Sequence, residues 1–275
     1  MDVDTSSLAT GYDADVAGFA MGGEGYFETE GGSYVRTGAA FGFSQNDVGS
    51  GLSSSSAEMW HAGLYASIEH GSLLASAAVA YSHTNYDFMR GIPVAGAAPL
   101  VATGDSDGDT FAVSLAASYD IAQQLGLDTS NGLRVAPIVR FDHVSADFNS
   151  FTEKGAGILN QTVAGAGWNR SWAGAGIQVS AAFETDGGAI VKPELELRFD
   201  HAFGDGNAHV ASRIPGVAGA AFNSAGAIEG DDALALGAGM KIEFNQTTSA
   251  HIRYDGTFSG DSNSHRASGG ITITF

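Results

Sequence analysis

Apolar side chains alternate with small or charged ones over long stretches of this chain. In the clearest run, Val191, Pro193, Leu195, Leu197 and Phe199 alternate with Lys192, Glu194, Glu196, Arg198 and Asp200. A period of two predicts a β-strand, because successive side chains of a strand point to opposite faces. About eleven such runs follow one another, near 17–21, 35–43, 60–68, 73–81, 111–119, 133–141, 173–183, 191–203, 234–244, 250–258 and 267–275.

The length and polarity of these runs distinguish two all-β classes. Most runs have about nine to eleven residues, the length of a tilted strand that crosses a bilayer, whereas globular strands more often have five or six. The face opposite the apolar one carries mostly Gly, Ala, Ser, Thr or charged residues, which cannot form the dry core of a β-sandwich. This pattern predicts an antiparallel up-and-down transmembrane β-barrel with a lipid-facing apolar surface and a wet interior. An open sheet is excluded because unpaired backbone amides in hydrocarbon cost several kcal/mol each.

Composition excludes several function classes. The 12 basic and 31 acidic side chains leave a formal charge of −19, which argues against nucleic acid as a partner. The absence of cysteine excludes disulfides and thiolate metal sites, and it suits export through an oxidising compartment. The longest apolar stretches fall short of the roughly 18 residues of a membrane helix. The acidic first residues do not resemble a secretory signal, so we expect either an internal protein or a native start elsewhere.

The segments between the runs alternate in length. Short ones lie at 28–32, 69–72, 184–188 and 245–248, and long ones are expected at 44–58, 82–109, 145–167 and 204–231, with 259–264 as a shorter member and 120–132 as an overlong exception on the short side. Outer-membrane barrels have short periplasmic turns and longer surface loops. We therefore expect the last strand to end at the periplasmic side.

Aromatic residues recur at the ends of the runs. Trp60, Tyr81, Tyr119, Phe183, Phe203, Phe244 and Phe275 are the examples. Such positions suit the aromatic girdles of a membrane barrel, although aromatic residues also favour strands in general.

Several segments, in their order and spacing, resemble the autotransporter β-domain, the C-terminal translocator of type V secretion. The most specific are LELRFDHAFGD at 195–205, DDALALGAGMKIEF at 231–244 and the final stretch 248–275, with similar segments at 59–71 and 136–157. The resemblance implies a monomeric barrel of about 12 strands in the outer membrane. It also implies insertion by the barrel-assembly machinery with periplasmic chaperones, a helix through the pore and an exported N-terminal passenger.

The resemblance assigns a role to the end of the chain. Phe275, Ile273 and Ile271 match the family's terminal assembly signal, a reading that is compatible with simple lipid contact. About eleven strands are recognisable in residues 14–275, whereas residues 1–13 are expected to be a linker or a remnant of the first strand. Since an eleven-stranded sheet leaves two edges in lipid, we expect a shortened chain, a start other than Met1, or a first strand formed irregularly by residues 1–12.

Charged residues on the polar faces are the candidate functional groups. Those expected in the lumen are Lys192, Glu194, Glu196, Arg198, Asp200, Lys241, Glu243, Arg253, Asp255, Arg140 and Asp142. Two interpretations stay open: the charges hold a helix or extended chain in the pore, or they only neutralise one another and keep the interior wet.

The sequence gives no catalytic, metal or cofactor prediction. The string DSDGD at 105–109 resembles the start of a calcium loop, but Thr110 and Ala116 replace the required Gly and Glu, so an acidic loop tip is expected. No H-E-x-x-H or G-x-S-x-G motif occurs. We therefore predict a non-enzymatic translocator, with a stand-alone porin or a loop-mediated adhesin as the alternative.

Overall fold

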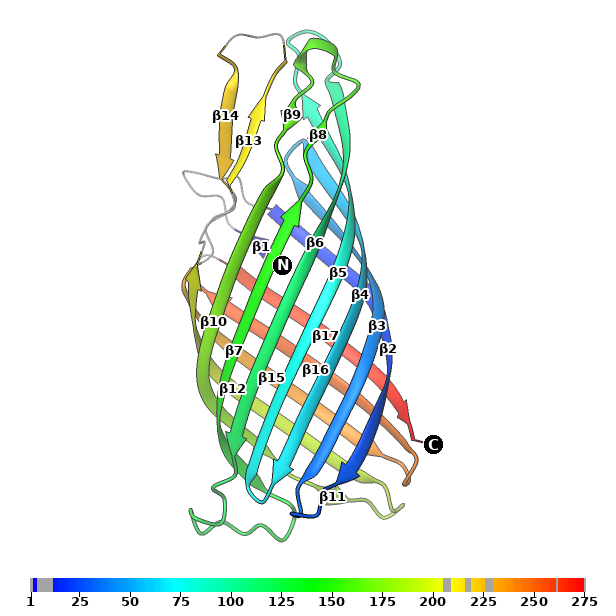
Figure 1. Ribbon diagram of the computed structural model, residues 1–275, viewed down its shortest axis with the longest axis vertical. Helices are drawn as coiled ribbons and strands as arrows, with labels where there is room; N and C mark the ends of the chain where they lie inside the picture. The colour runs from blue at the N-terminus through cyan, green and yellow to red at the C-terminus, as the bar shows by residue number, and fades with distance from the viewer. Residues whose placement is uncertain are drawn as a thin grey trace.

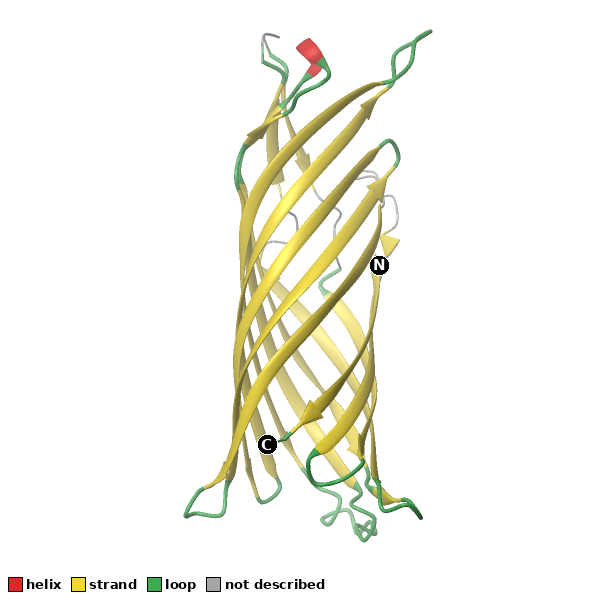
Figure 2. Ribbon diagram, turned by 90° about the vertical axis from the view of Figure 1, so that its right-hand side faces the viewer, coloured by secondary structure: helices red, strands yellow, loops and turns green. Residues whose placement is uncertain are grey.

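The computed structural model describes residues 2–3, 12–204, 209–215, 219–225, 230–260 and 262–274. Tilted antiparallel strands wrap into a tall cylinder (Figures 1 and 2). Its long strands are β2 (Tyr12–Glu28), β3 (Tyr34–Ser50), β4 (Ser53–His70), β5 (Leu73–Ile92), β6 (Leu100–Tyr119), β7 (Arg134–Phe148), β10 (Ala166–Ser180), β12 (Ile190–Gly204), β15 (Asp232–Glu243), β16 (Thr248–Ser259) and β17 (Ser262–Ile273). The prediction of an all-β antiparallel barrel is confirmed.

The sheet curls into a ring that one short strand closes. Each long strand pairs with its neighbours in chain order, and β10 pairs with β12 along eleven residue pairs. The two-residue strand β1 (Asp2–Val3) lies between β2 and β17 and is antiparallel to both. Among the described residues, β2 and β17 are joined only through this short strand, which lies in the segment expected as a linker or strand remnant.

The outward face carries an apolar band. On β6, Phe111, Leu115 and Tyr119 are exposed, and the equivalent positions of β4 hold Trp60 and Leu64. Cross-strand pairs extend the band around the barrel, as where Phe43 lies opposite Trp60 with ring centroids 4.9 Å apart. Such large apolar side chains, exposed on successive strands, define a lipid-facing surface.

Two of the expected long loops, 44–58 and 82–109, are mostly strand, so the loop bounds predicted there and the strand lengths are wrong. Strands β3 and β4 continue to a two-residue turn at Gly51 and Leu52, and β5 and β6 have 20 residues each. The DSDGD string lies inside β6 instead of at a loop tip. Polar stretches such as 53–56 form strand because every residue pairs across to β5, and solvated strands need no apolar face.

A second, four-stranded sheet stands at the long-loop end. It contains β8 (Phe151–Thr152), β9 (Thr162–Val163), β13 (His209–Arg213) and β14 (Ala221–Ala225). The segment that carries β8 is fixed to β5 by the bidentate pair between Arg90 and Glu153, at 2.9 and 2.5 Å, and by stacking of Phe151 on Phe88. The wall of the barrel is therefore higher on this side than along β15, β16 and β17 (Figure 1).

The opposite end carries short turns. The predicted turns near 28–32, 69–72, 184–188 and 245–248 are present, and the segment between β6 and β7 is the overlong exception. The two-residue strand β11 (Phe183–Glu184) pairs with the start of β12. Strand β17 runs toward this short-turn end (Figure 1).

Within the described residues, no helix is long and apolar enough to cross a membrane.

The alternation of faces predicts the effect of a charge placed on β6. Leu115→Arg puts a cation in the middle of the apolar band and should lower the stability of the folded barrel in lipid by about 2–4 kcal/mol. Ser114→Arg is the matched control, since Ser114 lies on the inner face opposite Asp142. The heat-modifiable folded fraction would measure both. Equal losses would contradict the assignment of the faces.

Candidate functional site

The inner face of β12 is charged, whereas its outer face is apolar. Leu195 and Leu197 are 59% and 46% exposed, whereas Glu196, Arg198 and Asp200 are each 8% exposed. Since a strand in a closed barrel has one face toward the lumen, these buried charges lie on the inner wall.

Two arginines connect the carboxylates of this wall. Arg198 binds Asp200 through Nε at 2.5 Å and Nη2 at 2.9 Å, and its Nη1 binds Glu196. Arg253 on β16 binds Asp255 at 2.8 Å and reaches across β15 to Glu194 at 2.6 Å. Its contact with Glu196, at 3.4 Å, links the two arginine clusters. Each guanidinium therefore has carboxylates on more than one side.

Glycines beside β12 give these arginines room. Gly237 and Gly239 of β15 lie opposite Glu196 and Glu194, between β12 and Arg253. A Cβ on Gly237 would lie 2.6 Å from the Arg253 Nη2. On the other side, Gly174 of β10 faces Asp200 closely enough that a Cβ would overlap its carboxylate. The small residues of β10 and β15 are therefore part of the charged site.

The other predicted lumen charges extend the same wall. Lys192 and Lys241 both bind Glu243, at 2.8 and 3.1 Å. On β7, Arg140 binds Asp142 at 2.7 Å. The structure therefore gives an ion-pair partner to every charged residue expected in the lumen.

Arg266 is a further charged residue of this inner wall, and the sequence analysis did not include it. Its Nε lies 3.9 Å from Asp255. Alternation with Ile271 and Ile273 on β17 could have identified it. With Arg266, the named ion-pair cluster holds six cations and six carboxylates, so this cluster is balanced in formal charge.

The wall formed by β3, β4 and β5 differs in chemistry. His61 lies between two hydroxyls, with Nε2 2.7 Å from Ser44 Oγ and Nδ1 2.6 Å from Ser82 Oγ. Nearer the short-turn end, Tyr65 donates to Glu24 at 3.0 Å. Hydrogen bonds of neutral groups thus accompany a long ion pair on this side, the 3.9 Å contact between Arg36 and Glu24, and the sequence analysis did not predict these contacts.

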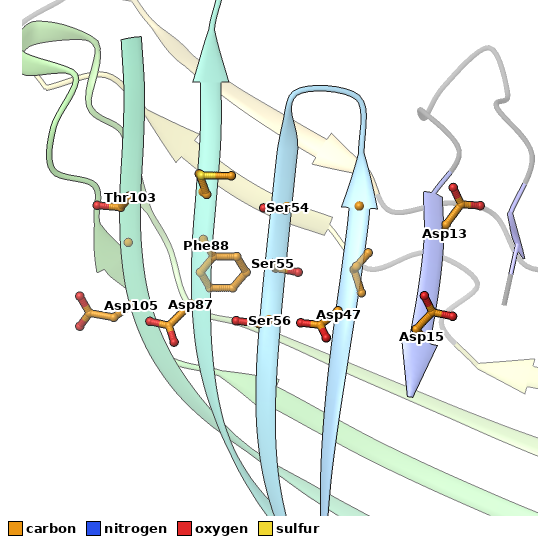
Figure 3. A pocket seen from close by; sticks show the side chains of 14 residues that line it. Asp13, Asp15, Asp47, Ser54, Ser55, Ser56, Asp87, Phe88, Thr103 and Asp105 are labelled. Atoms are coloured by element: carbon orange, nitrogen blue, oxygen red, sulfur yellow. The ribbon is translucent and has the colours of Figure 1, made fainter. Parts of the chain in front are cut away.

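A shallow pocket of about 700 Å³ lies on β2 to β6 near the long-loop end (Figure 3). Its carboxylates are Asp13, Asp15, Asp47, Asp87 and Asp105. Two like-charged pairs lie directly opposite in the sheet, Asp15 with Asp47 and Asp87 with Asp105, an arrangement that destabilises strand pairing. Among the described residues, no His, Cys, Asp and Glu group has the arrangement of a metal site, and we assign the pocket no ligand.

The predicted assembly signal lies partly outside the described residues. Phe275 is not described, whereas Ile271 and Ile273 are 75% and 57% exposed on the outward face of β17. Their exposure fits lipid contact, and the recognition role stays a prediction.

The closed ring, the outward apolar band and the charged interior define a transmembrane β-barrel. The autotransporter β-domain model matches residues 1–255. The chain therefore belongs to the autotransporter β-domain family and has the function of an outer-membrane translocator.

Solved translocator structures share the fold. The β-domain of the Bordetella autotransporter BrkA aligns over 98% of this chain and 94% of its own, with a TM-score of 0.64 and 15% identity. The translocator domain of NalP from Neisseria meningitidis aligns over 95% and 88%, with a TM-score of 0.66 and 13% identity. The transport unit of AIDA-I from Escherichia coli aligns over 97% and 84%, with a TM-score of 0.57 and 13% identity.

Two curated relatives are named as enzymes. Esterase EstA of Pseudomonas aeruginosa and of Pseudomonas putida are each 27% identical to this chain over 182 residues, which is 64% of this chain but 28% of the esterase. The match thus spans less than a third of each esterase. The absence of enzymatic activity from this chain stays a prediction.

The glycines of β10 and β15 on either side of β12 generate a test of the inner wall. A Cβ on Gly176 would overlap the Leu197 carbonyl oxygen, whereas a Cβ on Gly239 would have ordinary contacts of 3.6 Å or more. Gly176→Ala should therefore lower the free energy of unfolding by about 1–3 kcal/mol, the usual cost of overpacking. Gly239→Ala should leave it unchanged or slightly raised. Denaturant unfolding of both variants in detergent would compare them, and equal stabilities would contradict the packing described.

Proposed function

We propose that this barrel exports a polypeptide joined to its N-terminal side and then holds it at the cell surface. The observation that supports this is the family match over residues 1–255, together with a closed ring whose inner wall is charged but balanced. Nothing in the comparisons favours a stand-alone porin or adhesin.

The balanced wall suits the passage of chains of either charge. An excess of one sign would attract and hold segments of the opposite sign and repel segments of the same sign. Ion pairs within the wall, such as Arg253 with Glu194 and Asp255, satisfy each guanidinium without a ligand. The wall stays hydrated and offers a moving chain no strong binding site.

The orientation follows from the two ends of the barrel. We place the short turns and the end of β17 in the periplasm, and the tall wall with β8, β9, β13 and β14 at the cell surface, because outer-membrane barrels share this asymmetry. The barrel would be inserted as a monomer by the barrel-assembly machinery, with periplasmic chaperones protecting its apolar band. Its passenger would leave at the tall end.

Surface display tests the proposed function. The natural reading frame, with an epitope tag upstream of this domain, should expose the tag on intact cells. Protease treatment of intact cells should remove the tag while the barrel stays folded. A folded, heat-modifiable barrel whose tag stays inaccessible would exclude export by this domain.

The wall's charge balance generates a second prediction. Arg198→Gln with Arg253→Gln leaves a net excess of two carboxylates on the wall. Surface exposure of an Asp- and Glu-rich tag should fall roughly fivefold, the effect of ~1 kcal/mol for charges near each other in water, whereas a Lys-rich tag should be affected less. Arg213→Gln on β13 is the control, because Arg213 is exposed outside this wall. An equal decrease for both tags would contradict the electrostatic account.

The terminal residues generate a third prediction. Deleting Phe275, or replacing Ile273 by Ser, should strongly reduce the folded barrel in the outer membrane without reducing synthesis. Thr272→Ser on the opposite face is the matched control. Wild-type levels of heat-modifiable barrel in the deletion strain would remove the assembly role from Phe275.

A further inference from the structure

Histidines mark one boundary of the outward apolar band. On β5, β7, β12 and β17, the series of apolar outward residues ends, toward the long-loop end of the barrel, at a polar residue. This first polar outward residue is His83 on β5, His143 on β7, His201 on β12 and His265 on β17. On β5, β7 and β12, the next outward residue toward the short-turn end is Tyr81, Phe141 and Phe199, respectively. The four histidines belong to the four hairpins β5–β6, β7–β10, β12–β15 and β16–β17.

Each imidazole binds the partner strand of its hairpin. His83 lies 3.0 Å from Asp109, and His201 lies 2.8 Å from Asp232. These pairs are directly opposite in the sheet, and so are His143 and Ser171, whose side chains lie 2.9 Å apart. His265 lies 2.7 Å from the Tyr254 hydroxyl. The imidazoles are partly exposed, so they can contact the surroundings while they keep these bonds.

Carboxylates complete this boundary on the neighbouring strands. Asp15, Glu58, Asp109 and Asp232 are the first polar outward residues of β2, β4, β6 and β15. We call the four histidines and these four carboxylates the boundary ring. Other acidic groups on the outward face near His83 are Asp107 and Asp147, whereas His143 and His265 have hydroxyl partners.

Lysine and arginine are missing from the outward face of the long strands. All ten Lys and Arg residues of β2 to β7, β10, β12 and β15 to β17 share the face opposite the apolar band; they are Arg36, Arg90, Arg134, Arg140, Arg170, Lys192, Arg198, Lys241, Arg253 and Arg266. The imidazoles are therefore the groups of the boundary ring that can become cationic.

We propose that the boundary ring lies at the phosphate headgroups of the membrane, and that protonation of its four histidines strengthens the contact with anionic lipid. With neutral imidazoles, the ring carries four negative charges and repels phosphate. With protonated imidazoles, the four cations balance the four carboxylates of the ring and the repulsion is reduced. Histidine is the side chain whose charge changes between pH 5 and 8, and carboxylates remain mostly ionised above pH 5. This inference rests on the proposed membrane function.

Insertion into vesicles of defined charge tests the ring. The unfolded chain is diluted from urea into vesicles of phosphatidylcholine, or of phosphatidylcholine with phosphatidylglycerol, at pH 7.5 and 5.5. The heat-modifiable folded fraction is then followed with time. Acidification should speed insertion into the anionic vesicles by roughly fivefold or more, the effect of one charge at an anionic surface, and should change insertion into phosphatidylcholine little.

Variants identify the groups responsible. The quadruple variant H83Q/H143Q/H201Q/H265Q should lose the acid effect in anionic vesicles and still insert into phosphatidylcholine. The double variant H143Q/H265Q, which leaves both His–Asp pairs intact, should lose part of the effect and serves if the quadruple variant fails to fold. His61→Gln with His251→Gln is the control, because both residues lie on the inner face.

The outcomes separate the two proposals. An acid effect that persists in the histidine variants, or that is equal in both kinds of vesicle, would overturn the role of the boundary ring. Failure of the wild-type chain to insert into any vesicle would count against the membrane function itself.

Discussion

Backbone hydrogen bonding in hydrocarbon is the constraint on which the rest of this structure depends. A strand in a bilayer has no water for its amides and carbonyls, so each edge must meet another strand. The strands from β2 through β17 meet this demand by pairing neighbours in chain order and by joining β10 to β12, whereas β2 and β17 are joined, among the described residues, only through the short strand β1. Closure fixes the face of every side chain. The apolar residues must point to lipid, and their neighbours in sequence must point into the lumen.

The charged wall follows from that geometry. Once the alternate residues of β12 are placed inside, Glu194, Glu196, Arg198 and Asp200 are forced close together on one strand. Their charges become tolerable because arginines of β12 and β16 bind them, and because glycines on β10 and β15 leave space for the guanidinium groups. The abundance of glycine is thus explained in part by packing in the interior. Under the proposed function, the balance of six cations and six carboxylates in this cluster would also keep the passage from selecting polypeptides strongly by charge.

The sequence was sufficient for the fold class, which depends on a local period of two, and the same period selected the charges expected in the lumen. It did not predict the partners of those charges, which depend on the register of neighbouring strands. It was insufficient for the ends of the strands. The lack of apolar residues in 53–56 and 105–109 predicted loops there, but β3 to β6 continue beyond the outward apolar band, where pairing alone maintains a strand. The contact between Arg90 and Glu153 could not be predicted from the sequence either. The two residues are far apart in the chain, and Glu153 lies in a segment with little regular structure. Likewise, Ser44, His61 and Ser82 meet only because the register of three strands aligns them.

The junction at β1 has a mechanical consequence. Everywhere else around the described ring, adjacent strands are joined by nine or more residue pairs, whereas at this junction Asp2 and Val3 form only two residue pairs with β2 and two with β17. Widening of the cylinder would separate the most weakly paired strands first. It would therefore concentrate strain between β2 and β17 and leave the ladder between β10 and β12 intact. Any change in the circumference of the pore would therefore begin at the junction between β2 and β17.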